Sequence, residues 1–127
     1  MQYVILVSVL ILVQYQFFML RAGSARGKGN VKAPAISGDD NFERNLRVQL
    51  NTLEQLAITL PAMWICAVYF RTDVAAVLGT LFLIGRFVYS SGYLNDPAKR
   101  GPGMIIGFSA NIALIICCLY AAVIRLI

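Results

Sequence analysis

Charged and amide side chains stand where a long apolar segment begins. Asn51 follows Arg47 by four positions and Glu54 follows Asn51 by three, so an α-helix would place them on one face. An ionisable side chain inside a bilayer costs roughly 2.5–3.5 kcal/mol, and such residues usually serve a ligand, an ion or a partner. We call these three residues the first polar face, and it is suited to a ligand that carries both a carboxylate and a cation.

A second polar face follows in the next apolar segment. Arg86, Tyr89 and Tyr93 are separated by three and four residues and therefore also share a helix face. Counted from a turn at residues 71–73, Arg86 lies roughly 20 Å along its helix and Glu54 roughly 27 Å along the preceding one. Both faces would then lie in the same half of an apolar layer about 30 Å thick, and we predict that they form one site.

The donors and acceptors of this site suggest its ligand. Arginine side chains, including Arg100, would bind carboxylates, Glu54 would bind an ammonium group, and the amides of Asn51 and Gln49 would bind peptide groups. A zwitterionic small peptide satisfies all of these, whereas a simple ion does not need so many donors.

The elements that must position these residues are four membrane-spanning helices. The chain has 127 residues, of which 59% are hydrophobic and 13% charged, against about 25% charged in a soluble domain. No charge occurs in residues 1–20, 55–70, 74–85 or 101–124, and a spanning helix needs about 20 mostly apolar residues. We predict an all-α integral membrane four-helix bundle, a single domain over residues 1–127. Its expected helices are 2–21, 41–71, 74–95 and 103–126.

The first helix is expected to remain in the protein, because no basic residue precedes its apolar run, as one would in a signal peptide. The connection at 22–41 is rich in Gly, Ser, Lys and Pro and is expected to be irregular. Most cations stand in or beside the first and third connections: Arg21, Arg26, Lys28, Lys32, Arg44, Arg47, Lys99 and Arg100. Those connections should face the cytoplasm and both termini the outside. The net charge of +5 thus reflects membrane orientation and predicts no nucleic-acid partner.

The chain has no histidine, which excludes His-based triads, general bases and metal ligands. Cys66, Cys117 and Cys118 all fall inside apolar segments without a C-x-x-C spacing, and they are expected to pack as small hydrophobic side chains. No metal site is predicted.

Two motifs resemble those of a known family. Phe42-Glu43-Arg44-x-x-Arg47-x-Gln49-x-Asn51-x-x-Glu54 resembles the signature at the start of helix two in the MAPEG family, the membrane-associated proteins of eicosanoid and glutathione metabolism. Arg86-x-x-Tyr89-x-x-x-Tyr93, followed by Arg100, resembles the helix-three motif and the arginine that opens helix four. The resemblance covers nearly the whole chain and is greatest to the branch of microsomal glutathione transferases and leukotriene C synthases.

The resemblance implies a homotrimer that binds glutathione between neighbouring subunits near the cytoplasmic face. Carried over by position, the glutathione-binding residues would be Arg26, Arg47, Gln49, Asn51, Glu54, Arg86, Tyr89 and Tyr93. Arg100 would be the catalytic residue, holding the glutathione sulfur as a thiolate. Only the thiolate of a thiol, whose ordinary pKa is about 8.5, is a good nucleophile, and a guanidinium group lowers that pKa without exchanging a proton itself. The thiolate would attack a lipophilic electrophile, or reduce a lipid hydroperoxide, dissolved in membrane lipid. Glutathione would be a co-substrate.

The same residues also have structural interpretations. The first polar face could be a solvated helix start, and the tyrosines of the second could belong to the aromatic belt at the membrane surface. Arg86 could pair with Glu54 or with a neighbouring subunit, and Arg100 could be a loop charge that sets orientation.

The sequence also bears on the substrate of the chain and on two other functions, a lipid-binding scaffold and an exporter. The sequence departs from the leukotriene C synthase pattern at Gly27, Gln55 and Ala57, which weakens the case for an eicosanoid substrate. A non-catalytic lipid-binding scaffold, like the 5-lipoxygenase-activating protein of the same family, is the alternative function. A four-helix drug/proton exporter would need a glutamate in its first helix, which is absent here. The short chain is typical of a bacterial member, which would lie in the inner membrane.

Overall fold

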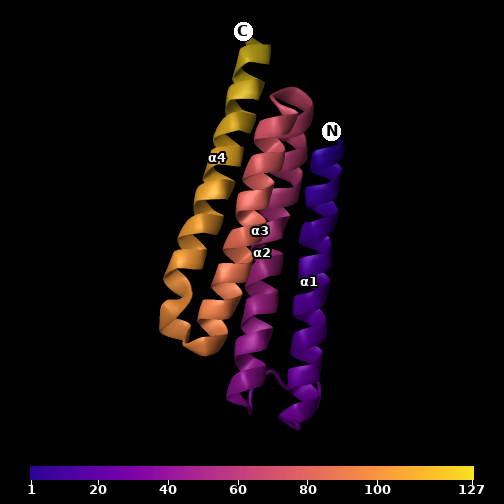
Figure 1. Ribbon diagram of the computed structural model, residues 1–127, viewed down its shortest axis with the longest axis vertical. Helices are drawn as coiled ribbons and strands as arrows, with labels where there is room; N and C mark the ends of the chain where they lie inside the picture. Colours follow the sequence, from indigo (N-terminus) through magenta and orange to yellow (C-terminus); the bar gives the residue numbers. More distant parts are fainter.

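The computed structural model describes residues 1–127 as four long helices joined by short connections. The elements in chain order are α1 (Gln2–Lys28), α2 (Asp40–Tyr69), α3 (Thr72–Asn95), the 3₁₀ turn η1 (Pro97–Arg100) and α4 (Gly101–Leu126). The helices run alternately up and down, and both chain ends lie at the same end of the bundle (Figure 1). The all-α four-helix prediction is confirmed.

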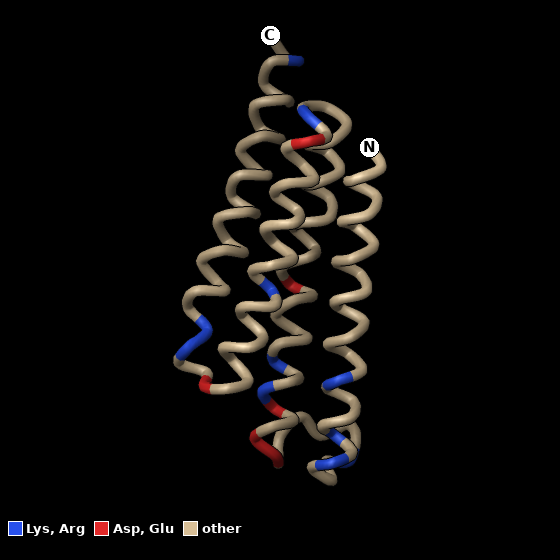
Figure 2. Tube along the Cα trace, viewed as in Figure 1, with Lys and Arg blue, Asp and Glu red and all other residues tan.

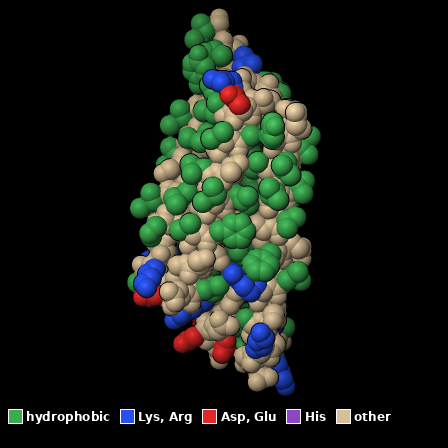
Figure 3. Space-filling model, viewed as in Figure 1, with side chains coloured by type: hydrophobic (Ala, Val, Ile, Leu, Met, Phe, Trp, Pro, Cys, Tyr) green, Lys and Arg blue, Asp and Glu red, His purple; other side chains and the backbone are tan.

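Each of the four helices is long and apolar enough to cross a membrane, judged by length and composition. Most lysines and arginines lie at the end of the bundle opposite the termini, which we call the basic end (Figure 2). Hydrophobic side chains cover much of the visible surface between the two ends (Figure 3). This distribution is the one expected for a bundle whose middle faces lipid.

The first helix is longer than the sequence predicted. We expected it to end at residue 21, but α1 continues to Lys28, where the N–H of Gly29 donates to the carbonyl of Ala25 at 2.9 Å. The glycines of this segment suggested a loop, yet Ala22 and Ala25 are buried, and Ala25 packs with Val31 and Phe42. Packing of this face therefore overrides the weak helix propensity of glycine.

The other helices begin and end within two residues of the predicted positions. Asp39 caps α2, because its carboxylate accepts from the N–H of Phe42 at 2.9 Å. Asp96 caps η1 in the same way by accepting from the N–H of Ala98 at 3.1 Å. Such caps satisfy N–H groups that have no partner within the helix.

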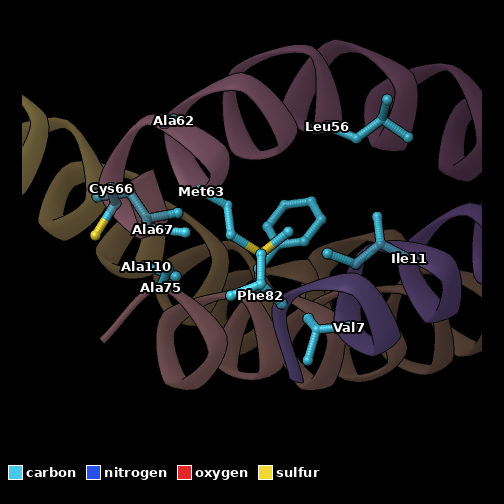
Figure 4. Close-up of a cluster of buried hydrophobic side chains, with 12 residues drawn as sticks. Val7, Ile11, Leu56, Ala62, Met63, Cys66, Ala67, Ala75, Phe82 and Ala110 are labelled. Atoms are coloured by element: carbon cyan, nitrogen blue, oxygen red, sulfur yellow. The ribbon is translucent and has the colours of Figure 1, made fainter. Parts of the chain in front are cut away.

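The main core lies between the four helices in the half nearer the termini. Phe82, Met63, Ile11 and Leu114 are fully buried within a cluster of 12 residues (Figure 4). At Gly79 of α3 a Cβ atom would meet the side chains of both Met63 and Val7, so glycine here lets α1, α2 and α3 approach closely.

Polar contacts join the helices deeper in the bundle. The hydroxyl of Thr59 donates to Asn111 Oδ1 at 2.6 Å, and Asn111 Nδ2 donates to Gln55 Oε1 at 3.1 Å. This network joins α2 to α4 where an unsatisfied amide would be costly.

Candidate functional site

The site is built around a buried arginine of α3. Arg86 is 1% exposed, and its guanidinium group reaches across to α2. Nη2 donates to Asn51 Oδ1 at 2.8 Å and to Thr52 Oγ1 at 3.0 Å, and Nε donates to Thr52 Oγ1 at 3.3 Å. Nη1 makes no hydrogen bond within the chain. The two polar faces are therefore joined, as the sequence predicted, through Arg86 and Asn51.

The partners of Arg86 are neutral oxygens. The ion pairs of the chain are Arg47–Glu54 and Arg71–Asp73, so Arg86 does not pair with Glu54. A buried cation without a nearby carboxylate is unfavourable unless its hydrogen bonds are satisfied or a ligand supplies the missing charge. The structure thus leaves a net positive charge beneath the first polar face.

The tyrosines of α3 continue this arrangement toward the basic end. Tyr89 is 2% exposed, its ring centroid lies 4.1 Å from the guanidinium carbon of Arg86, and it stacks on Tyr93 at 5.6 Å. The Tyr89 hydroxyl is also within electrostatic reach of Arg47 and Arg100. The aromatic pair therefore lies directly beside the buried guanidinium group of Arg86.

Close contact between α3 and α4 sets the position of Arg100. A Cβ atom on Gly103 would collide with the backbone of Tyr89, so the start of α4 lies directly against α3. Arg100 stands three residues earlier, at the end of η1, where its Nη1 donates to the carbonyl of Pro97 at 3.0 Å. The side chain is exposed and remains available to a ligand.

The remaining residues of the first polar face are open to solvent. Arg47 Nη1 and Glu54 Oε1 are 4.0 Å apart, with side chains 52% and 59% exposed, so this pair contributes little to stability. Gln49 is half-buried and makes no side-chain hydrogen bond. These side chains are free to contact a ligand.

Arg26 lies apart from the other predicted site residues. Its Nη1 donates to the carbonyls of Ala35 at 2.7 Å and Val31 at 3.4 Å, and its guanidinium carbon lies 4.4 Å from the ring centroid of Phe42. Within one chain, Arg26 therefore holds the connection between α1 and α2 rather than joining the two polar faces.

The sequence reasoning missed Thr52. Its hydroxyl donates to the carbonyl of Val48 at 2.7 Å and accepts from two nitrogens of Arg86. The residue is fully buried. Its place beside Asn51 is the only signal in the sequence for this role. Threonine is compatible with an apolar helix, so the residue type alone does not indicate a polar site.

The arrangement can bind an anionic and zwitterionic ligand and stabilise a developing negative charge. Fixed guanidinium groups hold carboxylates in forked geometry and lower the pKa of a bound thiol. No group of three or more His, Cys, Asp and Glu side chains is placed to hold a metal ion.

The chain is similar in sequence to known proteins over most of its length. A sequence model of the MAPEG family matches residues 4–120. The chain is 40% identical to an uncharacterized protein of Synechocystis over 111 residues, which are 87% of this chain and 81% of that protein. It is 35% identical to human microsomal glutathione S-transferase 2 over 109 residues, 86% and 71% of the two chains.

The match to a further relative covers fewer residues. Mouse leukotriene C4 synthase is 36% identical over 84 residues, which are 66% of this chain and 56% of that enzyme. The family match spans all four helices, and each of them can cross a membrane. The chain therefore belongs to the MAPEG family and is an integral membrane protein.

Proposed function

We propose that this protein is a membrane-embedded glutathione transferase that conjugates glutathione to lipophilic electrophiles. The observation that carries the proposal is the buried Arg86, held by Asn51 and Thr52 beneath an open polar face. A carboxylate of glutathione would supply the charge that this cation lacks, through the free Nη1. The similarity to proteins named glutathione S-transferase and leukotriene C4 synthase supports the same ligand.

Glutathione would bind along the joined polar faces. Its carboxylates would meet arginine side chains, its ammonium group would meet Glu54, and Asn51 and Gln49 would bind its peptide groups. The proposed binding set is Arg26, Arg47, Gln49, Asn51, Glu54, Arg86, Tyr89 and Tyr93.

Arg100 would activate the sulfur. Its guanidinium group would stabilise the thiolate, and the thiol proton would leave to water. The thiolate would then attack an electrophilic carbon of a molecule dissolved in the bilayer, forming a C–S bond. In a substitution, the displaced group would leave with the electron pair of the broken bond. In an addition, the electron pair of the broken π bond would form a carbanion that takes a proton from water.

The same thiolate could serve a peroxidase reaction. Attack on the distal oxygen of a lipid hydroperoxide would break the O–O bond and release the lipid alcohol. A second glutathione would convert the sulfenic product to oxidised glutathione and water. Both reactions place the sulfur between the aqueous end of the bundle and the lipid.

We propose a homotrimer, as the resemblance to the family implies. In one chain Arg26 contacts only its own α1–α2 connection and Phe42, so it would serve a glutathione site only as that of a neighbouring subunit. We also propose that the basic end faces the cytoplasm, because loop lysines and arginines favour that side.

The test is a near-ultraviolet difference spectrum of the detergent-purified protein titrated with glutathione at neutral pH. We expect a saturable thiolate band. Binding without the band would instead favour the non-catalytic scaffold of the same family. Absence of binding would overturn the proposed function.

The variant Arg100→Ala should keep glutathione binding and lose most of the thiolate band, with Lys99→Ala as a matched control that removes the adjacent charge. A thiol bound next to a removed cation should return toward its ordinary pKa of about 8.5. If Arg100→Ala forms thiolate as the wild type does, the catalytic role of Arg100 is wrong.

A further inference from the structure

A second polar cavity opens at the basic end, between α1, α2 and α3. It has a volume of about 210 Å³. Its polar lining consists of Arg21, Ser24 and Lys28 of α1 together with Asn41 and Asn45 of α2. None of these residues belongs to the proposed glutathione site, and no carboxylate lines the cavity.

Both cations of this cavity lack an acidic partner. Neither Arg21 nor Lys28 takes part in an ion pair of the chain. Arg21 Nη2 donates to Ser90 Oγ at 2.6 Å, but its buried Nε has no partner. A pair of unneutralised cations of this kind favours an anion between them.

An unpaired acceptor lies beside the cations. Asn45 is 3% exposed, and its Oδ1 has no hydrogen-bond partner. Its Nδ2 donates to the carbonyl of Asn41 at 2.8 Å, which fixes the orientation of the amide. A buried unpaired amide oxygen costs free energy, so a ligand with a hydroxyl group would stabilise this site.

An apolar groove begins one helical turn above the cavity, between α1 and α3. The guanidinium carbon of Arg21 lies 5.4 Å from the ring centroid of Phe17, and Phe17 lines a hollow of about 360 Å³ with Leu10, Val13 and Phe87. Leu10 also lines the next hollow between α1 and α3, of about 640 Å³. Gln14 Nε2 donates to the carbonyl of Leu83 at 3.0 Å beneath the groove.

The length of this groove fits one leaflet of a bilayer. Arg21 and Leu10 are eleven positions apart, a distance of about 16 Å along a helix. Half of an apolar layer about 30 Å thick is roughly the same length. The polar, cationic cavity thus suits a lipid headgroup, and the apolar groove that follows it suits an acyl chain.

We propose that the α1–α3 face binds an anionic phospholipid of the leaflet at the basic end. Its phosphate would lie between Arg21 and Lys28, a headgroup hydroxyl would donate to Asn45 Oδ1, and an acyl chain would occupy the groove. A helix end from a second copy is disfavoured, because the basic end of that copy would bring further cations against these two. No residue of the proposed glutathione-binding set lines this cavity.

The test is native mass spectrometry of the full-length protein in detergent, titrated with phosphatidylglycerol or with phosphatidylcholine of the same acyl chains. We expect retention of phosphatidylglycerol to exceed that of phosphatidylcholine by roughly tenfold. Arg21→Gln combined with Lys28→Gln should weaken phosphatidylglycerol binding roughly thirtyfold, and Lys28→Gln alone roughly fivefold, since each cation near a membrane surface contributes about equally.

A control pair removes the same charge outside the cavity. Lys32→Gln combined with Lys99→Gln should bind phosphatidylglycerol as the wild type does. Equal retention of the two lipids, or equal losses in the two double variants, would overturn the proposal. Displacement of the lipid by excess inorganic phosphate would show a site for free phosphate instead.

The groove is tested separately. Val13→Trp should fill the hollow and reduce phosphatidylglycerol binding at least fivefold with both cations intact, whereas Ile116→Trp on exposed α4 surface should not. If Val13→Trp changes the oligomeric mass and leaves lipid binding unaltered, the groove is a contact between copies and the proposal is wrong.

Discussion

At the scale of single residues, the site depends on a cation that the fold buries before any ligand is present. In place of water, the guanidinium group of Arg86 contacts the side-chain oxygens of Asn51 and Thr52 and the ring face of Tyr89. Hydrogen bonds to a charged group are worth more than those between neutral groups, about 1.5–3 kcal/mol. The cation is thereby held in one place, and the side-chain amide of Asn51 is held with it.

Thr52→Val should test this support directly. Valine keeps the shape but removes the acceptor of two Arg86 hydrogen bonds, so we expect a loss of about 1–3 kcal/mol in stability and a lower melting temperature in detergent. Glutathione affinity should fall as well, because Arg86 and Asn51 lose their fixed positions.

Thr80→Val is the matched control for that change. The hydroxyl of Thr80 donates only to the carbonyl of Ala76, at 2.8 Å, on an exposed part of α3. Its replacement should leave the melting temperature and glutathione affinity within error. Equal effects of the two variants would mean that Thr52 does not act through Arg86.

Arg86→Lys separates charge from geometry. Lysine keeps the cation but cannot donate in a fork to two α2 side chains. We expect glutathione affinity to fall roughly tenfold, measured by equilibrium dialysis, while the thiolate fraction of bound glutathione at saturation stays unchanged. A lost thiolate band at full occupancy would instead place Arg86, and not only Arg100, next to the sulfur.

At the scale of elements, small residues decide how the helices meet. Gly103 lets the first turn of α4 lie against the backbone of Tyr89, and Gly79 does the same where α1, α2 and α3 meet. The short η1 turn ends at Arg100, three residues before Gly103. The position of the proposed catalytic arginine is therefore a consequence of the α3–α4 contact.

Gly103→Ala should separate α4 from α3. The added methyl group collides with main-chain atoms, which cannot move aside as a flexible side chain would, and overpacking of this kind costs about 1–3 kcal/mol. We expect a lower melting temperature and a loss of the thiolate band larger than the loss of glutathione binding. Gly107→Ala in the same helix, where a Cβ meets no atom within 4 Å, should preserve both.

At the scale of the whole molecule, one chain provides an incomplete set of the proposed glutathione ligands. Within a chain Arg47 lies beside Glu54, whereas Arg26 is held at the α1–α2 connection. A cyclic trimer places one surface of each subunit against a different surface of the next. A trimer of this kind would bring Arg26 to its neighbour's polar faces.

Mixed trimers test that arrangement. If Arg26→Ala and Arg100→Ala are each inactive, their coexpression should restore about a quarter of the wild-type activity, because each mixed trimer then contains one intact site between subunits. Arg47→Ala coexpressed with Arg100→Ala should restore nothing, since both residues serve a site from the same subunit. Equal recovery in the two mixtures would argue against Arg26 acting across the interface.

The sequence by itself determined the four helices and the two polar faces. Uncharged runs long enough to span a bilayer permit little besides helices, and residues at spacings of three and four must share a helix face. The cap that Asp39 provides for α2 follows from a general preference, because a short acidic side chain before a helix satisfies its free N–H groups.

Only the tertiary structure decided which side chains meet. Periodicity sets the side of a helix on which a residue lies, but the approach and rotation of neighbouring helices come from packing at residues such as Gly103 and Gly79. Those contacts paired Arg86 with Asn51 and Thr52 instead of Glu54, extended α1 over buried alanines, and opened the groove between α1 and α3. These outcomes depend on the distances between helices, and the spacing of residues within one helix does not determine those distances.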